Sequence, residues 1–321
     1  MSRPLDAYRA KLQLVQWLRG SRSVDYYAAL RTDKDPHDRR QQAKSAAALD
    51  AGLLASASTY SVTDEMSALI AAAALNAPAE ALRQSDLPAP QGFVYFERPI
   101  PLRLLGTDGA VADVRAFQWE QATVSPVLED GRSGSPTPAI EIMPYMDSRS
   151  WSASQELADQ GLTMPPLVPV PFVIDQWWLN EAWRELVGQA DPDDPVYEVS
   201  PEQAAARRIL WTFFRLTFQK IAALSSQPLD RSTYRQAQRS GITAPPRSIL
   251  IVRLRRQYRP QDDDESAAPG NWTHRWVVKG FWRDQWYPSL GRHQSIYIHD
   301  YVKGPAHLPL VLKDRIYSLE R

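Results

Sequence analysis

The chain has 321 residues, with 37 basic and 37 acidic side chains and therefore a formal net charge of zero. The absence of cysteine excludes a disulfide scaffold, a cysteine zinc site and a cysteine nucleophile. Hydrophobic residues make up 44%, and no stretch approaches the roughly 20 apolar residues that cross a bilayer, so we expect a globular cytoplasmic protein without membrane contacts.

The first part of the chain, residues 1–190, is expected to form an acidic, mainly helical domain with a small sheet. Apolar residues at helical spacing and a start signal at Thr63 predict helices within residues 7–85. Asp175 is expected to begin a further, tryptophan-rich helix. Strands of the small antiparallel sheet are predicted at 93–96, 111–119 and 139–143.

A linker at 191–200, with the sequence DPDDP at its start, is expected to lead into a basic domain at 201–321. Pro201 directly after Ser200 predicts the start of a long helix over 201–224. A turn and a short basic helix from Arg231 to Arg239 would complete a helical hairpin at 203–241. Period-two alternation then predicts an antiparallel sheet with strands at 248–256, 273–282, 294–302 and 315–319. The predicted fold class is therefore α+β.

The neutral total hides two oppositely charged parts. Residues 1–206 hold 17 Lys and Arg against 28 Asp and Glu, a net charge of −11, whereas residues 207–321 hold 20 against 9, a net charge of +11. Such asymmetry favours nucleic-acid binding by the basic part. Two structural interpretations stay open: arginine and tryptophan fill interfaces between the domains, or the acidic part covers the basic part.

Side-chain alternation in the C-terminal strands predicts an apolar face and a basic, aromatic face. A bulge at Gly280 would exchange the faces of Trp282 and Arg283. A basic, aromatic face is typical of proteins that bind single-stranded nucleic acid, because rings stack on bases and cations neutralise phosphates. The predicted nucleic-acid-binding residues are Arg253, Arg255, Arg275, Lys279, Phe281, Tyr287, Tyr297, Tyr301 and Lys303.

The same surface has the residue types of a metal-independent ribonuclease, which needs a base for the 2′-hydroxyl, an acid for the leaving oxygen and cations for the phosphate. The candidate catalytic residues are His274, Arg283, His293, His299 and Tyr317. No metal or other cofactor is expected. Phosphate-loop, dinucleotide, zinc-protease and serine-hydrolase motifs do not occur in the sequence.

Two motifs, HRWVVKGFWRDQWYPS at residues 274–289 and YVKGP at residues 301–305, are distinctive. They resemble a C-terminal module of uncharacterised proteins from actinobacteria, their phages and mobile elements, with the pattern H-x-x-x-V-[RK]-G-H-W-R-x-Q-W-Y-P-S. Phe281 stands where that pattern has histidine, so a catalytic role of that position would not carry over. The resemblance covers residues 205–321 and implies a phage or mobile-element setting without an activity.

We therefore expect a phage- or mobile-element-type protein that binds RNA or single-stranded DNA through its C-terminal sheet. Cleavage of RNA, as a toxin or defence effector, is the enzymatic form of this hypothesis. A regulatory protein partner is compatible with it, and the acidic part would then shield the basic one. One alternative is a non-catalytic protein that recognises a host or phage protein through tryptophan-rich surfaces. Another is a DNA-binding regulator that uses the helical hairpin at 203–241.

Overall fold

The computed structural model of the chain describes residues 5–29, 35–78, 82–103, 111–125, 135–150, 159, 165–170, 175–178, 200–255, 273–305 and 307–311. Its helices are α1 (Asp6–Leu18), α2 (Ser21–Ala29), α3 (Pro36–Ser56), α4 (Asp64–Ala74), α7 (Pro201–Thr217) and α8 (Arg231–Arg239), with 3-10 turns at Gln84–Asp86 and Pro288–Leu290. Its strands are β1 (Ser58–Val62), β2 (Gln91–Arg103), β3 (Val111–Val124), β4 (Thr137–Asp147), β5 (Leu167–Pro169), β6 (Asp175–Trp178), β7 (Ala222–Pro228), β8 (Ser248–Leu254), β9 (Trp276–Val278), β10 (Phe281–Tyr287), β11 (Arg292–Ile298) and β12 (Tyr301–Lys303). None of the helices in these stretches combines the length and apolar composition needed to span a membrane.

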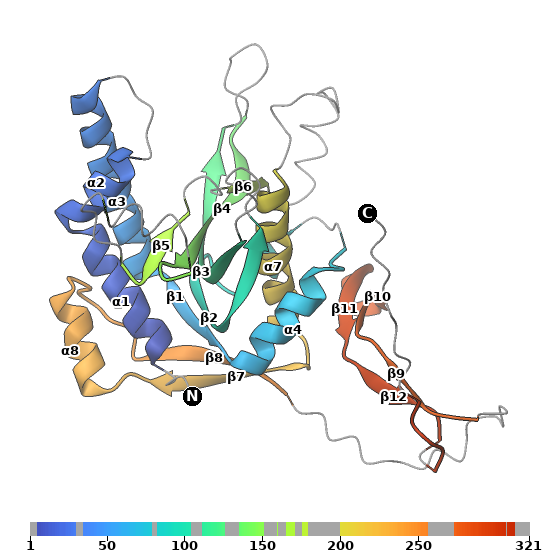
Figure 1. The fold of residues 1–321 in the computed structure, drawn as a ribbon. Helices are drawn as coiled ribbons and strands as arrows, with labels where there is room; N and C mark the ends of the chain where they lie inside the picture. Colours follow the sequence, from blue (N-terminus) through green and yellow to red (C-terminus); the bar gives the residue numbers. More distant parts are fainter. Residues whose placement is uncertain are drawn as a thin grey trace.

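One large mixed sheet organises the molecule (Figure 1). Its strand order is β5-β4-β3-β2-β1-β8-β7, and β6 pairs with a second part of β4. β1 is parallel to both of its neighbours, β2 and β8, and the other pairs are antiparallel. The predicted α+β class is confirmed. The sheet is larger than predicted because β1 and β8, which are distant in sequence, meet at its centre.

Helices cover both faces of the main sheet, with α1, α2, α3 and α8 on one face and α4 and α7 on the other (Figure 1). Successive side chains of a strand point to opposite faces. Phe93 and Val94, neighbours in β2, accordingly belong to different hydrophobic clusters. Both faces of the central strands are therefore buried.

Aromatic rings fill the core under α4 and α7. The ring centroid of Trp119 lies 5.0 Å from that of Phe214 and 5.6 Å from that of Tyr60. Trp119 passes directly over Gly92 of β2, where a Cβ atom would lie 2.0 Å from the indole ring. Glycine at position 92 therefore makes room for the indole ring of Trp119.

The predicted cap at the start of α7 is confirmed. Ser200 Oγ accepts a hydrogen bond from the Gln203 N–H, and Gln203 Oε1 accepts one from the Ser200 N–H. The helix ends at Thr217, earlier than predicted, because the chain turns into β7 at Ala222. β7 separates α7 from α8, and these two helices lie on opposite faces of the sheet. The predicted helical hairpin at 203–241 is therefore wrong, and with it the structural basis for reading DNA through that hairpin.

Two other expectations are corrected by strand pairing. Asp175 begins strand β6 rather than a helix, because its segment pairs antiparallel with β4. The strand predicted at 248–256 belongs to the main sheet as β8 rather than to the C-terminal sheet. The predicted strand at 315–319 and the linker residues 191–199 lie outside the described residues. The division into two domains stays a prediction, although the main sheet takes strands from both sides of the linker.

The remaining strands form one antiparallel C-terminal hairpin, residues 276–303. β9 pairs with β12, and β10 pairs with β11. Val278 faces Tyr301 and Phe281 faces Ile298, so a single register continues through the two unpaired positions between them. Gly280 therefore introduces no bulge, and its N–H donates a hydrogen bond of 2.6 Å to Asp300 Oδ1. β10 and β11 lie beside α4 and α7, whereas β9 and β12 extend away from the main sheet (Figure 1).

Candidate interaction surface

One face of the C-terminal hairpin is fixed to the body of the protein by Trp282 and Tyr297, which oppose each other in β10 and β11. The Trp282 ring centroid lies 5.3 Å from that of Tyr297 and 4.8 Å from that of Trp211 in α7. Trp282 Nε1 donates a hydrogen bond of 3.0 Å to the Ala73 carbonyl at the end of α4. The hairpin is thus anchored by burial of aromatic rings and by satisfaction of the indole N–H.

The side-chain amide of Gln219 holds the outer edge of β11. Gln219 Oε1 accepts a hydrogen bond of 2.9 Å from the Tyr297 N–H, and Gln219 Nε2 donates one of 3.4 Å to the Ser295 carbonyl. A carboxamide can provide one acceptor and one donor, as a neighbouring strand would. Gln219 therefore substitutes for a strand and fixes the position of β11 beside α7.

A buried ion pair provides a third attachment. Arg215 in α7 lies 3.1 Å from Asp86 Oδ1, and the two side chains are 7% and 5% exposed. Arg292, at the start of β11, reaches the same carboxylate oxygen at 4.0 Å. Asp86 also accepts a hydrogen bond from the Arg83 N–H at 3.0 Å. The carboxylate thus joins the hairpin, α7 and the turn before β2.

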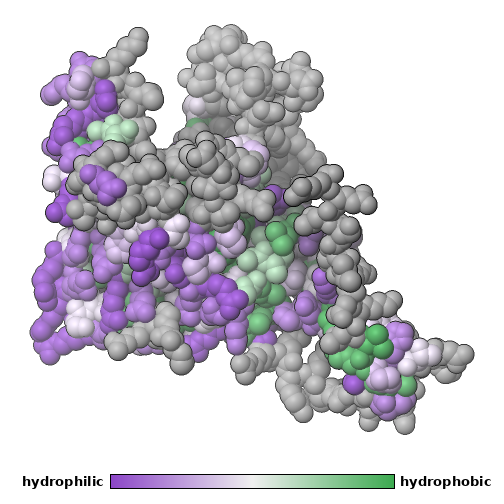
Figure 2. Space-filling model, in the orientation of Figure 1, coloured by the Kyte–Doolittle hydropathy of each residue, from purple (hydrophilic) through white to green (hydrophobic). Residues whose placement is uncertain are grey.

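The opposite face of the hairpin points outward and has an apolar centre. Its cross-strand pairs include Val277 with Val302, Phe281 with Ile298 and Arg283 with Ile296. Val277, Phe281 and Val302 are 42%, 40% and 49% exposed. Hydrophobic colour gathers over β9 and β12 in the space-filling view (Figure 2). We call this surface, made of Val277, Phe281, Ile296, Ile298 and Val302, the outward apolar patch.

Two basic side chains lie beside the outward apolar patch. Lys279 and Arg283 are exposed on the same face, and Arg283 Nη2 donates to Gln285 Oε1 at 2.8 Å. Residues 273–305 contain five Lys and Arg, namely Arg275, Lys279, Arg283, Arg292 and Lys303, against two acidic residues, Asp284 and Asp300. On the outward face itself, Lys279 and Arg283 are the exposed cations, and the register places Asp300 opposite Lys279.

The strand register places the residues of the predicted basic, aromatic face on two opposite faces of the hairpin. Trp282 opposes Tyr297 and Val278 opposes Tyr301, whereas Arg283 opposes Ile296. Tyr297, Tyr301 and Lys303 thus lie on the face of Trp282, and Lys279, Phe281 and Arg283 lie on the face of the isoleucines. The expectation that these residues share one face is wrong, because opposed residues of a hairpin point to the same side.

The three described candidate histidines are not brought together. His293 opposes Trp286 near the turn, His299 lies opposite Gly280, and His274 precedes β9. His293 and His299 are six residues apart along an extended chain, about 20 Å at the rise of a strand. An acid and a base for one scissile phosphate must both lie within hydrogen-bond reach of it. These two histidines do not satisfy that condition.

Each histidine has a local partner instead. His293 Nδ1 lies 3.2 Å from Asp284 Oδ2, His299 Nδ1 lies 3.0 Å from the Asp300 carbonyl oxygen, and His274 Nδ1 lies 2.9 Å from Thr273 Oγ1. The His293 ring also packs 5.1 Å from that of Trp286.

The other candidate residues are dispersed. Arg275 is tied into the chain that follows the hairpin, because its Nε donates to the Leu308 carbonyl at 2.7 Å. Arg253 and Arg255 lie in and just after β8 of the main sheet. Tyr287 ends β10 opposite Arg292. Tyr317 lies outside the described residues.

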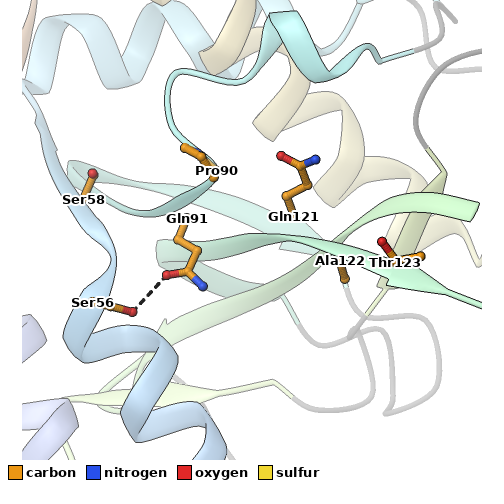
Figure 3. Close-up of a pocket in the computed structure, with 7 residues that line it drawn as sticks. All are labelled: Ser56, Ser58, Pro90, Gln91, Gln121, Ala122 and Thr123. Carbon is orange, nitrogen blue, oxygen red and sulfur yellow. Dashed lines mark hydrogen bonds between the residues drawn. The ribbon is translucent and has the colours of Figure 1, made fainter.

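A polar pocket that sequence reasoning did not identify lies at one end of the main sheet, with a volume of about 400 Å³ (Figure 3). Its lining residues carry no charge: Ser56, Ser58, Pro90, Gln91, Gln121, Ala122 and Thr123. Ser56 Oγ donates to Gln91 Oε1 at 2.9 Å (Figure 3). No local motif marks this pocket, because its walls come from α3, β1, β2 and β3.

A pair of carboxyl groups lies next to Gln91. Gln91, Glu120 and Glu141 are successive cross-strand partners in β2, β3 and β4. Burial, and then the neighbouring charge of Glu141, raises the pKa of Glu120 above its usual value. Burial likewise raises the pKa of Asp50, whose carboxylate accepts a hydrogen bond from the Tyr27 hydroxyl. Ionisation of Glu120 and Asp50 is therefore disfavoured where α3 packs on the sheet.

Comparison with known proteins gives a distant structural likeness only. No protein-family model matches the chain, and no curated protein matches it. Among solved structures, the chain is similar to the crystal structure of AcrVA2, with a TM-score of 0.42 and 11% sequence identity over 93% of this chain and 94% of that one. A likeness at this level bears on neither the activity nor the site.

Proposed function

We propose that this protein is a non-catalytic binding protein that docks a partner protein on the outward face of its C-terminal hairpin. The observation that carries the proposal is the contrast between the two faces of the hairpin. One face is anchored by Trp282 and Tyr297, and the other leaves Phe281 and its neighbours exposed. Exposed apolar patches that are surrounded by polar residues are more common at protein interfaces than on the rest of a soluble protein's surface.

The charge around the outward apolar patch defines the chemistry of the partner. Lys279 and Arg283 lie beside Phe281 on the outward face. Complementary charge speeds association and disfavours wrong partners, while the apolar centre provides affinity. The partner surface is therefore apolar or aromatic at its centre and acidic at its rim. The motif resemblance favours a host or phage protein in this role.

Nucleic-acid binding is the second candidate function, and the excess of 20 basic over 9 acidic residues in 207–321 favours it. Arg283 and Lys279 are exposed and flank Phe281, and Tyr287 at the end of β10 is the other aromatic residue of this strand on the same face. Single-strand binders use several stacked rings beside the cations. Because Tyr297 and Tyr301 lie on the opposite face of the hairpin from these cations, protein binding is the better supported function. The separation of the histidines gives no support to ribonuclease chemistry.

Selection of random displayed peptides on the immobilised full chain tests the main proposal. We expect enriched peptides that combine Asp or Glu with aromatic or aliphatic residues. A labelled enriched peptide should then bind Phe281→Ser and Val302→Ser proteins about tenfold more weakly or worse, since a central apolar contact is worth more than 1.4 kcal/mol. Leu49→Ser is the matched control, because Leu49 is also an exposed apolar residue but lies on α3.

Two outcomes would contradict protein docking. One is peptide binding that Leu49→Ser weakens as much as Phe281→Ser does. The other is tight binding of RNA or single-stranded DNA that falls steeply with salt and is lost in Arg283→Ala but kept in Val302→Ser. The second outcome would establish the nucleic-acid function, because phosphate contacts release counterions and apolar contacts do not.

A further inference from the structure

Strand β7 is an edge strand of the main sheet in the part of the chain that the structure describes. It is the terminal strand on its side, with no described strand beyond it. Its sequence, AALSSQP, contains no charged residue. Natural sheet edges usually carry charged side chains, prolines or bulges that prevent pairing with another chain. In β7 only Pro228, at the very end, has this character.

Hydrogen bonds at the two ends of β7 show which backbone groups are free. The Leu229 N–H donates to the Arg247 carbonyl at 2.9 Å, and the Arg255 N–H donates to the Ile221 carbonyl at 2.8 Å. In an antiparallel pair such bonds recur at every second residue. Odd-numbered residues of β7 therefore bond to β8, and Leu224 and Ser226 direct their N–H and C=O groups outward. Both residues are exposed.

We propose that β7 pairs with β7 of a second copy of this chain, antiparallel and centred on Ser225. Leu224 of one copy then opposes the partner's Ser226, and each such pair exchanges two backbone hydrogen bonds. The register places Pro228 opposite the partner's Ala222. Pro228 has no N–H to donate, and the Ala222 N–H already donates to the Gln219 carbonyl at 3.0 Å. Pairing therefore ends at this position without leaving a new unsatisfied donor.

Charge and apolar exposure favour a second copy as the occupant. Lys220 and Asp230 flank β7 at equal distances from Ser225, so antiparallel self-pairing brings Lys220 near the partner's Asp230, a carboxylate that within its own chain caps α8 and lies 3.3 Å from Arg9. The uncharged strand itself brings no like charges together. Phe218 and Leu224, which are 60% and 45% exposed, lie at or next to this edge. An interface related by a twofold axis must be self-complementary, and β7 satisfies that requirement.

Sedimentation equilibrium of the full chain over a range of concentrations tests self-pairing. We expect the mean mass to rise from the 36.3 kDa of one chain toward twice that value. Ser226→Pro should stay at the mass of one chain at every concentration, because it removes an outward N–H. Its thermal unfolding should match that of the wild type, since β8 does not use that N–H. Leu224→Lys should weaken association by repulsion, and Leu49→Lys is the matched exposed control.

Self-pairing at β7 would be overturned by a wild-type mass of one chain at all concentrations. It would also be overturned by association that persists unchanged in Ser226→Pro and Leu224→Lys, because the interface would then lie elsewhere. If the wild type stays monomeric and a peptide of different sequence adds to the edge, the edge is a docking site for another protein and the proposal is again wrong. None of these outcomes depends on the outward apolar patch.

Discussion

Burial of Lys11 in α1 gives the protein a pH-dependent stability that can be measured. The side chain is 0% exposed. Lys11 Nζ donates to the Ala57 carbonyl at 2.5 Å and to Thr59 Oγ1 at 3.2 Å, and it lies 5.7 Å from the centre of the Tyr8 ring. Among the described residues it forms no ion pair. Neutral partners do not offset the loss of water around an ammonium group.

Burial lowers the pKa of Lys11 from its usual 10.5 to about 7. A difference of 3.5 pKa units corresponds to about 5 kcal/mol of unfolding free energy. Below pH 7 Lys11 is protonated in both the folded and the unfolded state, and the folded state is destabilised by the full free energy of burying the charged ammonium group. Between pH 7 and 10.5 the unfolded state binds the proton and the folded state does not. The free energy of unfolding therefore rises with pH across this window, by about 1.4 kcal/mol per pH unit.

Urea denaturation of the wild type and of Lys11→Met at several pH values measures this effect. Subtraction of the two free energies cancels the titrating groups that do not contact Lys11, and Tyr8 is in contact with it. We expect the difference, wild type minus variant, to increase from pH 7 to about pH 9.5. Higher pH is avoided because Tyr8 also titrates there. Burial raises the pKa of Tyr8 to about 12 in the folded state, so above about pH 10 this tyrosine ionises in the unfolded state only, which lowers the free energy of unfolding. A difference that is constant or falls with pH would refute the assignment of a neutral buried lysine.

Three further predictions concern packing and charge. Asp86→Ala should lower the free energy of unfolding, measured in urea, by about 3–5 kcal/mol, because Arg215 would keep a buried charge without its partner. The control Asp64→Ala breaks an exposed ion pair with Arg98 and should leave the free energy of unfolding nearly unchanged. Gly92→Ala should destabilise the fold by about 1–3 kcal/mol or more, because the new methyl group meets Trp119, whereas Gly52→Ala, with open space in α3, should stabilise it by up to about 1 kcal/mol. Gly280→Ala places a Cβ atom 2.2 Å from the Tyr297 hydroxyl, so we expect faster proteolysis within the C-terminal hairpin while the melting temperature of the main sheet is kept.

Local signals in the sequence located several elements correctly. The Ser200–Pro201 start of α7 is present, and so is the short helix predicted from Arg231 to Arg239, which Asp230 caps by accepting a hydrogen bond from the Thr233 N–H. The apolar runs of β2, β3 and β4 likewise give strands. These features need no knowledge of distant residues, because caps and alternation act over a few positions.

Features that depend on distant pairing were missed. β1 is five residues long and lies between two helices, so nothing nearby distinguishes it from a loop. It is a strand because β2 and β8 bond to both of its edges. β6 is a strand for the same reason, since β4 supplies its partner. The short helix α8 is predicted correctly, but its position across the sheet from α7 depends on β7, whose residues the sequence pattern assigns to the end of the long helix and to a turn.

The length of the hairpin turn determines which side chains share a face at the candidate site. Tyr287 pairs with Arg292, so four residues form the turn. With an even number of turn residues, an odd-numbered residue of β10 always opposes an even-numbered residue of β11. Arg283 is thereby placed beside Ile296 and separated from Tyr297. A turn of three or five residues would have joined the cations to the tyrosines in one face suited to stacking bases. The alternation within each strand was read correctly, yet it could not fix which faces coincide. The observed turn instead places Lys279 and Arg283 beside an exposed apolar centre, and this arrangement favours a protein partner over a nucleic acid.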